Sequence, residues 1–210
     1  MSWFATQNEV PRDVPRILLI DDHPLYRHGF IAAFAIRLPD YTLVGAATAS
    51  EGSTELDKHP DTELVIIDFR LPGTDGLAAL TEFGARHPGV PRILISGEDG
   101  ADLAQRALNA GASGFIPKSL DIDTVEEGIR RVLAGEFFVP AVAAPAPGAL
   151  TLRQLEVLRL LGAGYSNRDI ASALHITERT AKAHMTAIFL SLGVESRTQA
   201  IIAAQRAGLL

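Results

Sequence analysis

The chain has 210 residues, of which 47% are hydrophobic and none is cysteine, so neither a disordered chain nor a disulfide framework or thiolate metal site fits it. No apolar run approaches 18 residues and the N-terminus lacks a signal-peptide pattern, so we expect a cytoplasmic protein without a membrane partner. The net charge of -6 combines -9 over residues 1–149 (12 Lys/Arg, 21 Asp/Glu) with +3 over residues 150–210 (7 Lys/Arg, 4 Asp/Glu). This asymmetry favours two parts with different functions, and nucleic acid is a candidate partner of the second part.

Strand and helix patterns alternate through the first part of the chain, after a loose leader at residues 1–15. Apolar, largely β-branched runs predict strands at 16–21, 41–47, 63–68, 92–97 and 113–118. The helical patterns between and after them cover 24–38, 50–59, 75–87, 99–110 and 121–134. Five such units predict an α/β domain over 16–135, built on a five-stranded doubly wound parallel sheet of flavodoxin-like topology. In such a sheet, ligands bind beyond the carboxyl ends of the strands.

Polar residues stand at the ends of four predicted strands. The first strand ends on Asp21 and Asp22, the third on Asp68, the fourth on Ser96 and the fifth on Lys118. Three carboxylates at one sheet edge repel one another, and Mg²⁺, which prefers oxygen ligands, relieves that repulsion. An added ammonium and hydroxyl make a cradle for a transferred phosphoryl group, with Asp68 as the nucleophile.

A composition change separates this domain from the rest of the chain. The segment "VPAVAAPAPGAL" at 139–150 contains three prolines, and we expect a linker over 136–148. Short helical patterns follow over 149–210. "TLRQLEVLRLLGAG" is expected to place Leu152, Leu155, Leu158 and Leu161 on one helix face. Two further short helices joined by "LHI" at 174–176 suggest a helix-turn-helix, whose second helix enters the major groove.

The motifs "IDDHPLYRHGF", "IIDFRLPGTDG", "LISG" and "GFIPKS" resemble the receiver domain of bacterial two-component response regulators over residues 16–135. The resemblance implies that Asp68 accepts a phosphoryl group from a sensor histidine kinase. It also implies a Mg²⁺ site formed by Asp22, Asp68 and the backbone carbonyl of Arg70, with Asp21 acting through water.

The same resemblance assigns a switch. Lys118 would pair with the phosphoryl oxygens, Ser96 would move in to bond the phosphate, and Phe115 would follow it inward. Core packing explains Phe115 equally well, because it alternates on a strand. His23 and His28 flank the site without other ligand types beside them, and we interpret both as structural.

The second segment resembles the LuxR-type DNA-binding domain of NarL/FixJ-family regulators over residues 149–210, a four-helix all-α domain. The resemblance implies a recognition helix at about 177–191, with Lys182, Ala183 and Thr186 facing bases. It names three phosphate partners, which are Thr180, Arg168 and Arg197. Two departures from the family pattern bear on DNA: Ser191 replaces a usual lysine, which weakens non-specific affinity, and Thr186 cannot make a bidentate guanine contact.

The sequence therefore predicts a transcription regulator switched by phosphorylation of Asp68. Phosphorylation would promote a homodimer that places two recognition helices on promoter DNA, with RNA polymerase as a further candidate partner. The protein would catalyse only its own phosphoryl uptake and loss.

Three alternatives remain. A phosphohydrolase would use Asp68 as nucleophile, but the acid/base aspartate that many such enzymes carry two residues on is Arg70 here. A constitutive DNA-binding protein would keep the receiver only for dimerisation. An acyl-homoserine-lactone domain could precede a LuxR-type domain, but the acidic strand ends disfavour it.

Overall fold

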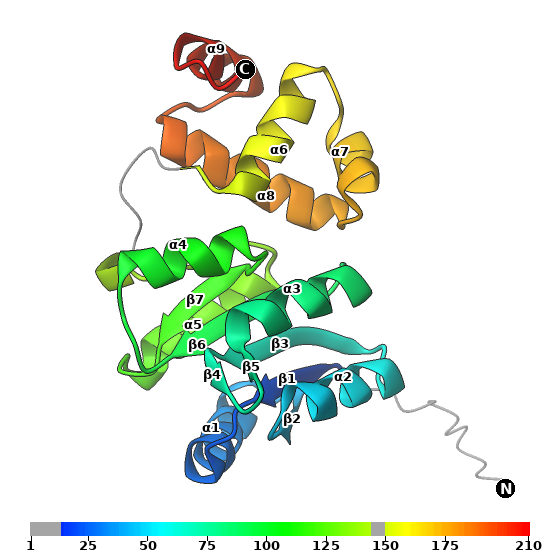
Figure 1. The fold of residues 1–210 in the computed structure, drawn as a ribbon, viewed down its shortest axis with the longest axis vertical. Coiled ribbons are helices and arrows are strands. Elements are labelled where there is room, and N and C mark those ends of the chain that lie inside the picture. The colour runs from blue at the N-terminus through cyan, green and yellow to red at the C-terminus, as the bar shows by residue number, and fades with distance from the viewer. Residues whose placement is uncertain (1–13, 144–149) are drawn as a thin grey trace, which may run out of the picture.

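A computed structural model describes residues 14–143 and 150–210, so the leader predicted at 1–15 lies almost wholly outside the described residues. The N-terminal domain is built on five parallel strands in the order β2-β1-β3-β6-β7 (Figure 1). Their bounds are β1 Arg16–Ile20, β2 Thr42–Ala46, β3 Thr62–Asp68, β6 Arg92–Ser96 and β7 Gly114–Pro117. The predicted doubly wound α/β fold is confirmed.

Helices cover both faces of this sheet. One face carries α1 (Pro24–Arg37) and α5 (Ile122–Leu133). The other carries α2 (Ala49–Lys58), α3 (Gly76–Arg86) and α4 (Ala101–Asn109). Alternation along the strands divides the core, since Ile17 belongs to the α1/α5 cluster and Leu18 to the opposite one. Burying each such side chain contributes about 1.5–3 kcal/mol to folding.

The strand register brings the predicted polar residues to one edge. Asp68 stands opposite Ile95, and Ser96 stands opposite Pro117, directly before Lys118. Ile20 stands opposite Ile67, so Asp21 follows β1 at the level of Asp68. All four strand ends therefore meet at the carboxyl edge of the sheet.

A small hairpin lies where no strand is expected. Residues Arg70–Leu71 (β4) and Thr74–Asp75 (β5) pair antiparallel directly after Asp68. The turn between them contains Gly73 with φ +78°, a conformation that costs glycine nothing and other residues much more. The hairpin fixes how the chain leaves the strand end.

The first part of the predicted linker packs on the N-terminal domain. Phe138 is buried in the core, and its carbonyl accepts a hydrogen bond of 2.9 Å from the N–H of Phe115 on β7. A 3₁₀ turn at Ala141–Ala143 follows, with Ala143 fully buried. Packing thus extends past residue 135, because the exposed edge of β7 offers backbone groups for pairing. Residues 144–149 of the linker lie outside the described residues.

The C-terminal domain is all helical. Its elements are α6 (Leu152–Gly162), α7 (Asn167–Leu174), α8 (Glu178–Leu192) and α9 (Arg197–Arg206). Hydroxyl side chains accept a hydrogen bond from the first turn of every one of them, at Thr151, Ser166, Thr177 and Ser196. In the described ranges 14–143 and 150–210, no helix is long and apolar enough to cross a membrane.

The prediction that four leucines share one face of α6 is wrong for the first of them, Leu152. Leu161 is fully buried, but Leu152 is 64% exposed. Leucines three residues apart advance about 300° per step, so the row drifts by roughly 60° each time and Leu152 ends opposite Leu161. Val157 and Gln154 take the buried positions instead.

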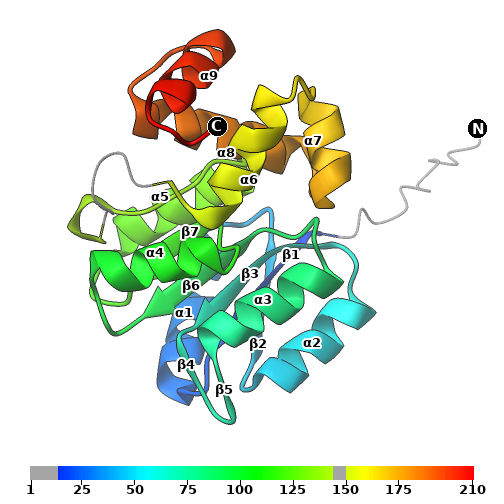
Figure 2. The ribbon, with the colours of Figure 1, turned by 45° about the horizontal axis from the view of Figure 1, so that its top comes forward.

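The two domains are in contact in this structure, and α8 faces the N-terminal domain (Figures 1 and 2). The ring of Phe137 lies 4.7 Å from the ring of His184 on α8. The Leu152 N–H donates a 3.1 Å hydrogen bond to Asn109 Oδ1 at the end of α4. Thr177 and Thr180 line a cleft with Thr62 and Ser113, which stand at the amino ends of β3 and β7. The contact is therefore at the opposite sheet edge from Asp68.

Candidate functional site

Buried carboxylates and one ammonium form the centre of the carboxyl-edge site. Asp21 is fully buried and Asp68 is only 2% exposed. Lys118 Nζ lies 2.8 Å from Asp68 Oδ2, to which it donates a hydrogen bond, and 2.7 Å from Asp21 Oδ2. Three of the predicted residues are thus in direct contact.

The environment makes Asp68 more basic than an ordinary aspartate. Burial is the largest effect and raises the pKa of Asp68, and the charge of Asp21 acts in the same direction. The hydrogen bond and charge of Lys118 and the backbone N–H of Arg70 oppose this rise without cancelling it. Burial alone would lower the pKa of Lys118, but its bonds to both carboxylates reverse the sign and raise it. Lys118 therefore stays charged beside the carboxylate at neutral pH.

Tyr26 on α1 belongs to this site, although sequence reasoning did not single it out. Lys118 Nζ lies 4.4 Å from the centre of its ring, a cation–π distance. Burial, followed by the charges of Asp21 and Asp68, raises the pKa of Tyr26. Its place four residues after Asp22, at the start of the first helix, was the available signal.

The donor set fits a hard divalent cation. Single ligand atoms of Asp21, Asp22, His23 and Asp68 all lie within 4.8 Å of one another. In the part of the chain that the structure describes, Lys118 is the only Lys or Arg within 4.0 Å of these carboxylates, so the cluster keeps a net negative charge. Carboxylate oxygens are the ligands that Mg²⁺ prefers. The expectation that His23 has no ligand groups beside it is wrong, since its Nδ1 lies 2.9 Å from Asp22 Oδ1.

The remaining predicted switch residues lie on the neighbouring strands. Ser96 is buried at the end of β6, and its Oγ accepts a 2.9 Å hydrogen bond from the N–H of Glu98. Phe115 on β7 is fully buried in the core beneath α4. The side chain of Arg70 points away from the carboxylates and pairs with Glu98.

The start of α3 lies very close to the backbone at Asp68. A Cβ on Gly76, the first residue of α3, would lie 2.4 Å from the carbonyl oxygen of Asp68 and 2.7 Å from Phe69 Cα. Only glycine permits this contact without moving the strand end. The Gly76 N–H donates a 2.7 Å hydrogen bond to the Phe69 carbonyl, which ties α3 to the end of β3.

The second candidate site is the helix-turn-helix of α7 and α8. Its turn contains His175 at φ +53°, the only non-glycine residue in the left-handed region within the described ranges. Lys182 and Thr186 are exposed on α8, and Ala183 is half-buried. The Thr186 hydroxyl donates a 3.2 Å hydrogen bond to the Lys182 carbonyl, so its methyl group is free to face a partner.

The three expected phosphate partners differ in their surroundings. Arg168 is exposed on α7. Thr180 shares a 2.8 Å hydroxyl contact with Thr177, the cap of α8. Arg197 donates to the carbonyls of Leu161 at 3.2 Å and Tyr165 at 2.6 Å, so it holds the end of α6. That structural contact was not foreseen from the sequence.

The exposed face of α8 is turned toward the N-terminal domain. Lys182, Ala183 and Thr186 form one wall of a cleft of about 700 Å³. The opposite wall includes Arg131 and Phe137, from α5 and the segment after it. A DNA duplex must place its backbones on both sides of an inserted helix, so it cannot enter this cleft.

Comparison with known proteins decides the family. Residues 17–130 match the response regulator receiver domain, and residues 148–204 match the luxR family of bacterial regulatory proteins. The chain is a response regulator of the NarL/FixJ family. It is 31% identical over 208 residues to the glycerol metabolism activator of Pseudomonas putida, covering 90% of this chain and 94% of that protein. It is 29% identical over 201 residues to the nitrate/nitrite response regulator NarL of Escherichia coli K12, covering 89% and 93%.

Solved structures agree with this family. A LuxR-family response regulator from Aurantimonas is 32% identical with a TM-score of 0.57, covering 61% of this chain and 91% of that one. The RcsB–DNA complex has a TM-score of 0.58 at 20% identity, covering 91% and 98%, which shows the shared fold. The N-terminal domain of this regulator is thus its receiver, and the C-terminal domain is its LuxR-type DNA-binding domain.

Proposed function

We propose that a sensor histidine kinase phosphorylates this regulator on Asp68 and that the phosphorylated form binds promoter DNA as a homodimer. The observation that carries the proposal is the buried pair of Asp68 and Lys118, 2.8 Å apart beside Asp21. A buried carboxylate with a raised pKa is a nucleophile, and a fixed ammonium can pair with the arriving phosphoryl oxygens.

Mg²⁺ would be held by Asp22, Asp68 and the Arg70 carbonyl, with Asp21 acting through water. When bound, the ion neutralises charge on the transferring phosphoryl group. Lys118 and Ser96 would bond the phosphoryl oxygens afterwards, and Phe115 would follow Ser96 inward. The phosphoryl group adds roughly two negative charges, which is enough to reorder the groups around the site.

The domain contact supplies the switch. In the described arrangement the receiver covers one side of the proposed reading face of α8, although Lys182 and Thr186 stay exposed, so DNA binding would require the domains to separate. The seven residues of β3 place the contact about 20 Å from Asp68. The signal would therefore pass through the strands and α4, not through direct contact. RNA polymerase would be the partner of the DNA-bound dimer.

Intact mass after incubation with a small phosphodonor and Mg²⁺ tests the chemistry. We expect one acid-stable, hydroxylamine-labile phosphoryl group, which is absent in Asp68→Asn. Asp40→Asn is the matched control, because Asp40 is an exposed aspartate between α1 and β2, outside the carboxyl-edge site. Labelling that survives in Asp68→Asn would move the nucleophile elsewhere. Asp22→Ala should weaken Mg²⁺ binding and labelling together, and normal Mg²⁺ affinity would contradict the metal site.

Fluorescence anisotropy with promoter duplexes tests the switch. We expect the phosphorylated chain to bind more tightly than the unphosphorylated chain and to sediment as a dimer. Equal DNA affinity in both states would favour the alternative in which the receiver only supports dimerisation.

A further inference from the structure

Arg179 on the recognition helix has no assigned role, yet it extends the DNA-reading face. At about 100° per residue, Arg179, Ala183 and Thr186 fall within roughly 40° of one line along α8, and Lys182 lies about 60° to one side. All four line the same cleft of about 700 Å³. Arg179 is the second residue of the helix, and the N-terminal residues of a recognition helix are those that reach base edges.

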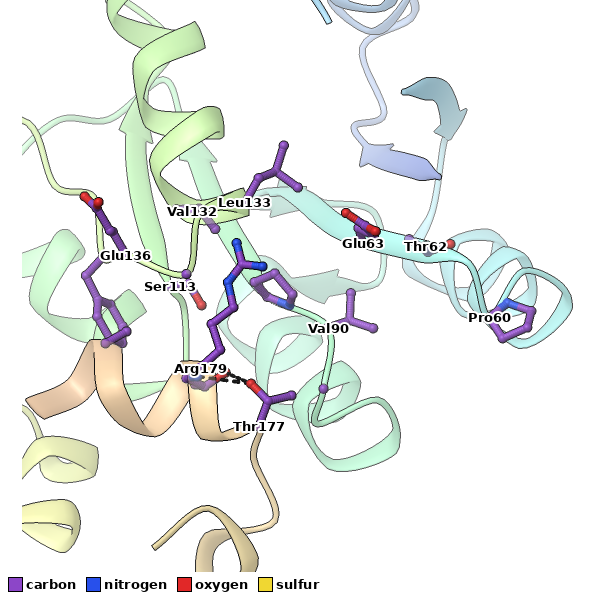
Figure 3. Close-up of a pocket in the computed structure, with 16 residues that line it drawn as sticks. Pro60, Thr62, Glu63, Val90, Ser113, Val132, Leu133, Glu136, Thr177 and Arg179 are labelled. Atoms are coloured by element: carbon purple, nitrogen blue, oxygen red, sulfur yellow. Dashed lines mark hydrogen bonds between the residues drawn. The ribbon is translucent and has the colours of Figure 1, made fainter. Parts of the chain in front are cut away.

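The guanidinium of Arg179 has no fixed partner. Across residues 14–143 and 150–210, no carboxylate lies within 4.0 Å of it and no hydrogen bond engages it, although the side chain is fully extended (Figure 3). Arg197 and Arg153 differ from it, because both donate to backbone carbonyls of their own domain. The planar fork of Arg179 is therefore free of competing hydrogen bonds once the domains separate.

The receiver currently holds this side chain. A Cβ on Gly135 would lie 2.3 Å from Arg179 Nε, so the arginine stem rests on the backbone at the end of α5. Figure 3 shows the guanidinium directed between Val132 and Glu63 of the receiver. Burial and then the charge of Glu63 raise the pKa of Tyr41, which directly precedes β2, and the charge of Arg179 opposes this rise. The Arg179 guanidinium is therefore within electrostatic reach of Tyr41.

We propose that Arg179 reads a guanine in the promoter half-site by a bidentate contact once the domains separate. The inference rests on the proposed DNA-binding function. Arginine matches the two major-groove acceptors of guanine, which Thr186 cannot do. The helix rise of about 1.5 Å per residue places Arg179 about 4.5 Å along α8 from Lys182, so the guanine should lie about one base step from the pair that Lys182 contacts.

The test uses the full phosphorylated chain and duplexes randomised across the half-site, read by anisotropy at two salt concentrations. Arg179→Ala and Arg179→Met should both lose preference for G·C at one position, by roughly 5- to 150-fold. The methionine variant is decisive, because it keeps a long flexible stem but has no donor for the guanine acceptors. Lys182→Ala is the matched control and should keep that preference.

The outcomes separate cleanly. If neither Arg179 variant changes selectivity while Lys182→Ala weakens binding, Arg179 does not read guanine and the DNA-binding function stands. If the phosphorylated wild-type chain binds no duplex in the randomised pool, the proposed function fails and this inference fails with it.

Discussion

Burying an ionisable residue of the carboxyl-edge site costs this regulator folding free energy. Asp68 is nearly inaccessible to solvent, and its surroundings disfavour its charged form on balance. Stability is thus exchanged for a reactive carboxylate, as is common where a buried group must do chemistry. His184 is another buried titratable residue, on α8, the proposed recognition helix.

Asp68→Asn should stabilise the protein at neutral pH. Because the pKa of Asp68 is raised, the folded state binds its proton more readily than the unfolded chain, and the stability it contributes at low pH is lost as pH rises through the raised pKa. The gain from asparagine should be largest at pH 7 and should shrink below about pH 4. Urea unfolding at both pH values measures this, and a less stable variant at pH 7 would contradict the assigned pKa direction.

His184 should make the protein sensitive to mild acid. Burial, with a smaller effect from the charge of Arg153, lowers the pKa of His184 to about 3, so the folded state keeps it neutral while the unfolded chain protonates it near pH 6.5. Stability should fall as pH falls from about 6.5 toward 3. Between pH 7 and 5 the loss is about 2 kcal/mol.

Urea titrations of wild type and His184→Leu at pH 7 and 5 test this expectation, with His175→Gln as the exposed-histidine control. The leucine variant should lose less stability on acidification than wild type and the control. Equal losses in all three chains would mean that His184 does not govern the acid response.

Contacts among β3, the β4–β5 hairpin and α3 fix the positions of the side chains in the carboxyl-edge site. The start of α3 approaches the end of β3 so closely that a side chain at Gly76 would meet backbone atoms of Asp68 and Phe69. The β4–β5 hairpin joins these two elements and sets the path of the chain at Arg70. The carboxyl-edge site therefore depends on helix and hairpin positions as much as on its own side chains.

Gly76→Ala should destabilise the receiver by about 1–3 kcal/mol and slow phosphorylation, because backbone cannot move aside as a flexible side chain can. Gly29→Ala is the matched control. Gly29 lies within α1, and apart from its chain neighbours and the backbone of its own helix no described atom would lie within 4 Å of an alanine methyl group there, so this substitution should be neutral or stabilise by about 0.5–1 kcal/mol. Thermal unfolding and phosphorylation rates compare the two variants. Similar behaviour of both would show that the close approach at Gly76 is unimportant.

The whole molecule joins two events at opposite sheet edges. The proposed phosphoryl chemistry belongs to the carboxyl edge, while α8 rests near the amino edge, against Phe137 and Gly135 (Figures 1 and 2). Clefts of about 440, 540 and 700 Å³ lie between the domains, so the contact is loosely packed, and under the proposed function a modest free energy from phosphorylation would open it. Under the proposed function, this arrangement would make DNA binding depend on phosphorylation without any change in the fold of either domain.

Phe137→Ala should favour the open arrangement before phosphorylation. Its ring contacts the ring of His184 at 4.7 Å, and such aromatic pairs contribute about 0.5–1.5 kcal/mol beyond burial. DNA affinity of the unphosphorylated variant should rise by roughly 2- to 13-fold, while that of the phosphorylated form stays unchanged. Phe137→Tyr keeps the ring and should resemble wild type. Unchanged affinity in unphosphorylated Phe137→Ala would mean that this contact does not limit DNA binding.

The sequence alone determined the α/β receiver, the helical second domain and the strand-end positions of Asp21, Asp68, Ser96 and Lys118, because hydrophobic periodicity and short polar motifs are local signals. Only the tertiary structure decided which groups touch. The cation–π contact of Tyr26, the place of His23 beside Asp22, the use of Arg197 to hold α6, and the burial of Phe138 depend on residues brought together from separate elements. The domain contact also depends on tertiary structure, because no local sequence pattern around Arg179 or Gly135 predicts that these two residues touch.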